Sequence, residues 1–156
     1  MGKIGTVSLL LMMCLMAGCD SDNDSPPPNH MQLFFVRVGT ADLYLTDFTQ
    51  NQSPPTDKPI VMGFSATLDK GSAENAVKLF EKNSNTEIQI TLSYLDNEKT
   101  VSALPDDELQ PTFTYVLQVG NILKGAANET FAGVSVEFTT IPGTLAVASI
   151  AINGTN

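Results

Sequence analysis

Apolar and polar side chains alternate through the middle of the chain, most clearly in residues 88–94 and 112–119. In these two runs the alternate apolar positions are Ile88, Ile90, Leu92 and Tyr94, followed by Phe113, Tyr115, Leu117 and Val119. A period of two places successive side chains on opposite faces of a strand, with one face buried and one solvated. The sequence predicts seven or eight short strands, in the runs 33–38, 43–46, 60–65, 77–81, 88–94, 100–104, 112–119 and 134–139.

One segment departs from this period. Residues 72–77 favour a short helix, because Ala-Glu-Asn-Ala suits a helix better than a strand, and Ser72 is its expected N-cap. Turn-forming residues separate the strands, and residues 96–99 join two alternating runs as the loop of a hairpin would. The pattern as a whole predicts an all-β fold, an antiparallel β-sandwich over residues 31–140 with one short helix.

The inward-facing positions of these strands predict the core of the sandwich. We expect it to contain Phe64, Leu79, Ile90, Leu92, Tyr115, Leu117 and Phe138. Tyr115 follows an acidic loop at residues 106–111, which leaves two interpretations of its role. It is either a tyrosine corner, with its hydroxyl bonded to the loop backbone, or an ordinary core tyrosine.

Several short motifs occur in the order and spacing of one known domain family. They are PIVMGFSATLD at residues 59–69, KTV at 99–101, LQPTFTYVL at 109–117 and EFTT at 137–140. Together they resemble bacterial Ig-like domains of the SbsA type, although GAAN at residues 125–128 lacks the Asp of the usual loop. The resemblance implies an Ig-like β-sandwich of the kind that serves as a spacer or accessory module in surface and secreted proteins. It brings no catalytic residues with it.

Residues 1–18 predict a lipoprotein signal peptide. Lys3 precedes an apolar stretch of about a dozen residues, too short for the roughly 20 that a membrane-spanning helix needs. The stretch closes with Met-Ala-Gly-Cys at residues 16–19, which resembles the bacterial lipobox and implies cleavage before Cys19 and acylation of its thiol. The alternative is an ordinary secretory signal followed by an incidental cysteine.

Residues 19–30 predict an acidic, proline-rich tether. Its prolines favour an extended conformation. Acidic residues directly after a lipidated cysteine resemble the surface-export signal of Bacteroidetes lipoproteins, which implies a surface-exposed location on the outer membrane. In enterobacteria an Asp after the cysteine instead resembles an inner-membrane retention signal. A periplasm-facing or inner-membrane location is therefore the alternative, and the membrane itself is the expected partner of Cys19.

The C-terminal residues 141–156 predict a linker followed by strand-like sequence. The stretch at 150–155 partly repeats residues 36–40, as the first strand of a second, similar domain would. The alternative is an additional edge strand of the same sandwich.

Composition excludes several functions. The net charge of −9, from eight Lys and Arg against seventeen Asp and Glu, argues against nucleic-acid binding. His30 is the single histidine and lies beside the tether, so we expect no catalytic residue. We expect no cofactor and no metal, since the acidic run at residues 106–108 lacks the spacing of an EF-hand loop.

Two aromatic residues are candidates for a binding surface. Phe34 stands beside Phe35, so in a regular strand one of the pair must face away from the core, and Tyr44 is the tyrosine placed to lie outside. An exposed Phe34 or Tyr44 would serve as an interdomain contact or as a ligand patch. The sequence favours a non-catalytic spacer module that presents a partner domain in a surface glycan-handling protein. The alternative is a surface lipoprotein that binds polysaccharide directly.

Overall fold

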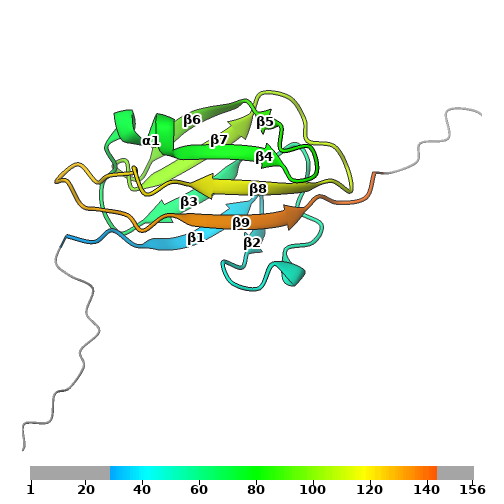
Figure 1. Ribbon diagram of the computed structural model, residues 1–156, viewed down its shortest axis with the longest axis horizontal. Helices are drawn as coiled ribbons and strands as arrows, with labels where there is room; N and C mark the ends of the chain where they lie inside the picture. Colours follow the sequence, from blue (N-terminus) through cyan, green and yellow to red (C-terminus); the bar gives the residue numbers. More distant parts are fainter. Residues whose placement is uncertain (1–28, 144–156) are drawn as a thin grey trace, which may run out of the picture.

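Two antiparallel sheets pack face to face in the computed structural model, which describes residues 29–143 (Figure 1). The five-stranded sheet has the order β2-β1-β3-β7-β6 and the four-stranded sheet the order β5-β4-β8-β9. The strands are β1 (Leu33–Val38), β2 (Ala41–Leu43), β3 (Ile60–Phe64), β4 (Val77–Glu81), β5 (Glu87–Ile88), β6 (Ile90–Leu95), β7 (Thr100–Pro105), β8 (Thr114–Val119) and β9 (Val134–Thr139). With the short helix α1 (Lys70–Ala76), they confirm the predicted antiparallel sandwich.

Four sequence predictions lie outside the described residues. They are the signal peptide, the lipidation of Cys19, almost all of the tether and the strand-like sequence after residue 143. Among the described residues, no helix is long and apolar enough to cross a membrane.

The predicted strand at residues 88–94 is divided between the two sheets. The division falls at Gln89, which belongs to neither strand; its carbonyl accepts the amide of Asp106, the residue directly after β7, at 3.0 Å. As a result β5 pairs with β4 in one sheet, and β6 pairs with β7 in the other. The chain thus changes layers within one run that has an unbroken period of two.

The core lies between the sheets and confirms most of the predicted set. Five of the seven predicted core residues are buried, namely Phe64, Leu79, Tyr115, Leu117 and Phe138. The prediction was wrong for Ile90 and Leu92, which are half-buried and pack against the margin of the core. The cause is the position of β6 at the edge of its sheet, where the opposite layer ends in the two-residue strand β5.

The helix begins two residues earlier than predicted, and its N-cap lies three residues earlier. Asp69 is the N-cap, and its carboxylate accepts the amide of Gly71 at 3.1 Å. Ser72 lies in the first turn, where its hydroxyl accepts the amide of Lys124 at 2.9 Å and donates to the carbonyl of Asp69 at 2.8 Å. Ser72 therefore ties the helix to the loop before β9 instead of capping it.

Two predicted strand boundaries also change. β2 ends at Leu43, so Tyr44 begins a loop that leads to the 3-10 helix η1 (Phe48–Gln50). β8 begins only at Thr114, because Thr112 has a φ of 63° and breaks the extended backbone. Phe113, predicted on the buried face of this strand, is consequently 42% exposed.

The tyrosine-corner interpretation of Tyr115 is confirmed. The side chain is 2% exposed, and its hydroxyl accepts the backbone amide of Gln110, five residues upstream, at 2.8 Å. Burial raises the pKa of the Tyr115 hydroxyl above its ordinary value of 10.0, and the nearby Glu81 carboxylate raises it further. The amide of Gln110 opposes part of this rise because it stabilises the ionised form.

We expect Tyr115→Phe to lower the free energy of unfolding by about 1 kcal/mol at pH 7, because the Gln110 amide loses its acceptor. The raised pKa adds a pH dependence. Below pH 10 the hydroxyl is protonated in both states and its stabilising contribution is complete; the contribution is lost as the pH rises through the raised pKa. Urea denaturation between pH 8 and pH 11 should show a smaller alkaline loss for Tyr115→Phe than for the wild type.

Tyr44→Phe is the matched control. Its ring is 52% exposed, so removal of the hydroxyl should change the free energy of unfolding at pH 7 by less than about 0.5 kcal/mol. Equal effects of the two substitutions would show that the corner hydrogen bond contributes nothing to stability.

Candidate functional site

An aromatic face lies on the outside of the five-stranded sheet, along its β1–β2 edge. We define it by the side chains of Phe34, Phe35, Arg37, Asp42 and Tyr44. The register of β1 and β2 produces it. Arg37 lies opposite Asp42, and the adjacent pair, Val36 and Leu43, is buried. Since side chains alternate along a strand, the neighbours of buried residues point outward.

A β-bulge places Phe34 in solvent. Leu33 pairs with Phe64 and Phe35 pairs with Gly63, so two steps along β1 match a single step along β3. Phe34 is the extra residue, and its side chain is 64% exposed. The ring of Phe35 lies over Gly63, where a Cβ atom would overlap it. The absence of a side chain at residue 63 is therefore what allows the Phe35 ring to pack against the sheet.

Arg37 supplies the polar part of the aromatic face. Its guanidinium lies 5.2 Å from the centroid of the Phe35 ring, within the range of a cation–π contact. Its Nε atom is 2.7 Å from the carboxylate of Asp42 across the strand pair. Both charged side chains are well exposed, so the ion pair itself adds little to stability. Its effect is to hold a hydrogen-bond donor, the Arg37 guanidinium, and an acceptor, the Asp42 carboxylate, beside the aromatic rings.

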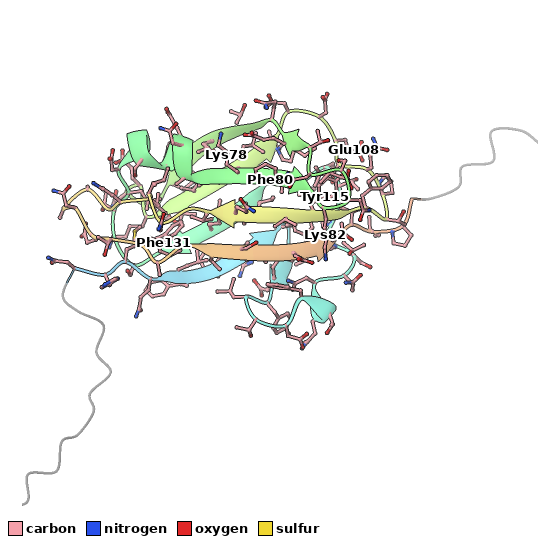
Figure 2. All side chains as sticks on the ribbon, in the orientation of Figure 1. Lys78, Phe80, Lys82, Glu108, Tyr115 and Phe131 are labelled. Atoms are coloured by element: carbon pink, nitrogen blue, oxygen red, sulfur yellow. The ribbon has the colours of Figure 1, made fainter. Side chains whose placement is uncertain are left out.

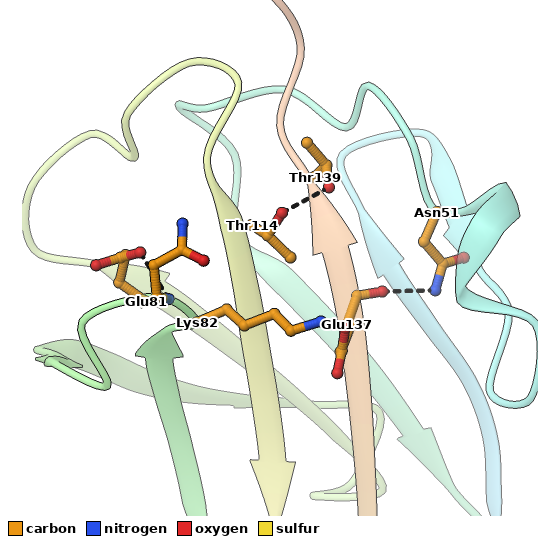
Figure 3. A network of polar contacts seen from close by, with 7 residues as sticks. Asn51, Glu81, Lys82, Thr114, Glu137 and Thr139 are labelled. Atoms are coloured by element: carbon orange, nitrogen blue, oxygen red, sulfur yellow. Dashed lines mark hydrogen bonds and ion pairs between the residues drawn. The ribbon is translucent and has the colours of Figure 1, made fainter.

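The backbone of Tyr44 is fixed by the side chain of Asn51, which is 1% exposed. The amide of Tyr44 donates to Asn51 Oδ1 at 2.7 Å, and Asn51 Nδ2 donates to the carbonyl of Tyr44 at 2.9 Å. The same Nδ2 donates to the carbonyl of Glu137 on β9 at 2.8 Å (Figure 3). One buried amide thereby uses both of its donor hydrogens and its acceptor oxygen, and it links the aromatic face to the other sheet.

The loop between Tyr44 and Asn51 is held by a capped 3-10 turn. The carboxylate of Asp47 accepts the amide of Thr49 at 3.2 Å, and the hydroxyl of Thr49 and the side-chain amide of Gln50 at 2.5 Å each. The hydroxyl of Thr49 is the main cause of the lowered pKa of Asp47, followed by the side-chain amide of Gln50. Phe48 packs against the core from this turn, so Tyr44 is presented by an anchored loop.

The structure brings together the two residues that the sequence offered as a surface. Phe34 and Tyr44 line one shallow groove together with Phe35 and Arg37. Sequence reasoning missed Asn51, because an asparagine in a turn-rich stretch is ordinarily exposed. Its partner on β9 is 86 positions away, and no local signal points to that contact.

The opposite face of the sandwich differs in character. The outside of the four-stranded sheet carries, along β4 and just after it, the side chains of Lys78, Phe80 and Lys82 (Figure 2). Lys78 pairs with Glu87 at 3.0 Å, and Lys82 reaches across β8 to Glu137 at 2.5 Å (Figure 3). Cations and carboxylates neutralise one another there, whereas the β1–β2 edge exposes aromatic rings.

Two of the three carboxylates in the acidic run at residues 106–108 accept hydrogen bonds from other segments. Asp106 accepts the hydroxyl of Thr91 at 2.9 Å, and Glu108 accepts that of Thr56 at 2.5 Å. Within residues 29–143, no three His, Cys, Asp or Glu side chains gather as a metal site requires. His30 is exposed at the N-terminal end of the sandwich, with its Nδ1 atom 3.4 Å from the hydroxyl of Thr130.

Comparisons with known proteins agree with this fold. The sequence profile of one family, described as a bacterial Ig-like domain, matches residues 44–140. Among solved structures, domains 1–6 of the bacterial surface layer protein SbsC are similar at 17% identity and a TM-score of 0.52; the match covers 74% of this chain and 14% of that one. The Ig-like character expected from the short motifs is therefore confirmed.

A second similar structure is native alpha-2-macroglobulin from Escherichia coli spanning domains MG0-NIE-MG1. It has 19% identity and a TM-score of 0.52, and the match covers 74% of this chain and 33% of that one. The chain thus spans a minor part of either protein, and at these identities the likeness concerns the fold alone. No curated protein sequence matches the chain.

We expect Asn51→Ala to lower the free energy of unfolding by about 2–4 kcal/mol, because three backbone groups at Tyr44 and Glu137 lose their partner. Urea denaturation measures the loss, and hydrogen exchange at the Tyr44 amide should accelerate beyond the change in global stability. Gln52→Ala is the neighbouring control, since that side chain is exposed and its removal should cost less than about 0.5 kcal/mol. If Asn51→Ala behaves like the control, the buried amide is not the anchor of Tyr44.

Proposed function

Because the chain belongs to the bacterial Ig-like domain family, we propose that it is a non-catalytic structural module of a bacterial cell-envelope lipoprotein. In this proposal lipid on Cys19 holds the protein to the outer membrane, and the acidic tether of residues 19–30 separates the sandwich from the bilayer. The sandwich then carries a partner domain farther out. The observation that carries the proposal is the position of the two ends of the described chain.

The chain enters the sandwich beside the start of β9 and leaves it at the far end of the same strand. At the entry, Thr130 donates to the carbonyl of Asn29 at 2.8 Å, and Met31 donates to that of Thr130 at 2.9 Å. At the exit, Ile141 lies two residues after the end of β9. The two ends lie at opposite ends of the long axis (Figure 1). Such a module extends a chain in series, as a spacer must.

The comparisons support an envelope setting for this module. The similar SbsC domains come from a protein named as a surface layer protein, and the sandwich described here has the same fold. The lipobox-like residues 16–19 and the acidic residues after Cys19 support a lipid-anchored, surface-exposed location. A periplasm-facing or inner-membrane location is the alternative within the same proposal.

Lipid anchoring has a direct test in Cys19→Ala. We expect the wild type in the membrane fraction, with an acylated Cys19 as the first residue of the N-terminal peptide in mass spectrometry. Acyl chains contribute about 0.8 kcal/mol per buried methylene, so their loss should release the variant from the membrane. Cys14→Ala is the matched control and should stay acylated and membrane-bound. A Cys19→Ala protein that is cleaved normally and remains in the membrane fraction would refute the anchor.

A second candidate function is supported by the aromatic face. Phe34 and Tyr44 are exposed in one groove beside the Arg37–Asp42 pair, which combines apolar rings with hydrogen-bonding groups. Ligand sites join these two kinds of group, and aromatic rings are suitable platforms for sugar rings. The candidate is a lipoprotein that recognises a polysaccharide directly with the β1–β2 edge.

A glycan array probed with the full chain separates the two candidates. Polysaccharide recognition predicts a specific signal of micromolar affinity that falls at least tenfold in both Phe34→Ala and Tyr44→Ala. Leu95→Ala is the control, because Leu95 is as exposed as Tyr44 but lies on the β6 edge of the sheet. The absence of any wild-type signal, or equal loss in the control, would remove this candidate and leave the structural module.

A further inference from the structure

Two large apolar side chains are exposed at the end of the sandwich where the described chain leaves it. Phe113 is 42% exposed and Ile141 is 45% exposed. They come from segments that are bonded to each other, since the amide of Thr112 donates to the carbonyl of Ile141 at 3.2 Å. We call the surface formed by Pro111, Phe113 and Ile141 the exit pole.

The chain is held firmly as far as the exit pole. The amide of Ile141 donates to the carbonyl of Pro54 at 3.0 Å, and that of Thr140 donates to Phe113 at 3.0 Å. The hydroxyl of Thr140, itself 2% exposed, donates to the carbonyl of Gln110 at 2.6 Å. Two loops therefore clamp the chain after β9 and set the direction in which it leaves.

The backbone beside Phe113 is strained. Thr112 has a φ of 63°, which a β-branched residue rarely adopts. This conformation interrupts the alternation of the strand, so the Phe113 ring is exposed rather than buried. Strain of this kind persists where the surrounding structure imposes it, and it is concentrated at functional positions. The ring is thus held at the surface, where a docked segment can cover it.

We propose that the exit pole is the docking surface for residues 145–152 of the same chain, so that the module that follows is held in a fixed direction. This inference rests on the proposed role of the domain as a spacer. Residues 144–156 begin directly at the pole, since Gly143 lies against Pro111, with the position of a Cβ 3.3 Å from that ring. They hold no charged residue and include Leu145, Val147, Ile150 and Ile152.

The length of this segment suits the surface. At about 3.3 Å per residue, eight extended residues reach roughly 26 Å, enough to cross one end of a small sandwich. Its apolar side chains match the exposed Phe113 and Ile141 in chemistry, and their burial against these residues removes apolar surface from water. The aromatic face, on the outside of a sheet, remains available for a different partner.

A thermal double-mutant cycle tests the docking. Phe113→Ser is introduced into the full chain and into a chain that ends at Gly143, and the melting temperature of all four proteins is measured. We expect Phe113→Ser to lower it by about 4 °C or more in the full chain and by less than about 1 °C in the shortened chain. Ile141→Ser should show the same dependence on residues 144–156.

Ile122→Ser is the control, because Ile122 is 53% exposed in the loop that follows β8, at the other end of that strand from Phe113. Its effect should be equal in the two chains. Equal effects of Phe113→Ser in both chains, whether large or small, would overturn the docking. The Cys19→Ala experiment concerns the other end of the protein, so the lipid anchor and the exit-pole contact can fail independently.

Discussion

The side-chain amide of Asn51 is the contact on which both exposed surfaces of this domain depend. It is buried, and it joins the loop after β2 in one sheet to β9 in the other through three hydrogen bonds. Backbone bonds continue from it, because the carbonyl of Asn51 accepts the amide of Thr139 at 2.9 Å and Ser53 donates back at 2.8 Å. Tyr44 on one side and the chain leaving β9 on the other are thus placed by one residue.

The sandwich could be predicted from sequence because its strands alternate with a period of two, a local signal that tertiary packing reinforces. The errors occur where a distant contact overrides that signal. The helix cap moved to Asp69 because Ser72 bonds to Lys124 instead. The single run at 88–94 divided at Gln89 because the strand crosses between layers, and Ile90 is only half-buried because the opposite sheet ends beside it.

The candidate surface could be predicted in part, for a specific reason. Adjacent aromatic residues, Phe34 and Phe35, cannot both face the core from a regular strand, and that constraint is visible in the sequence. The bulge that exposes Phe34 depends on pairing with β3, and the support of Phe35 depends on Gly63 across the sheet. The exposure of Phe113 was not predictable, because nothing in the composition of Pro111-Thr112-Phe113 announces a positive φ at a threonine.

The pairing at the two ends of β9 also determines how the domain responds to mechanical force. The entering chain at His30 is bonded in parallel to Thr130, and Gln52 is bonded in parallel to Thr139. A pull between the two ends acts along these strands, so the pairs at either end of β9 are sheared together instead of opening one after another. Bonds that must break at the same time raise the barrier to unfolding. Resistance to force depends on the unfolding rate, and a higher barrier lowers that rate. A sandwich connected in this way resists stretching along its long axis better than peeling from one edge.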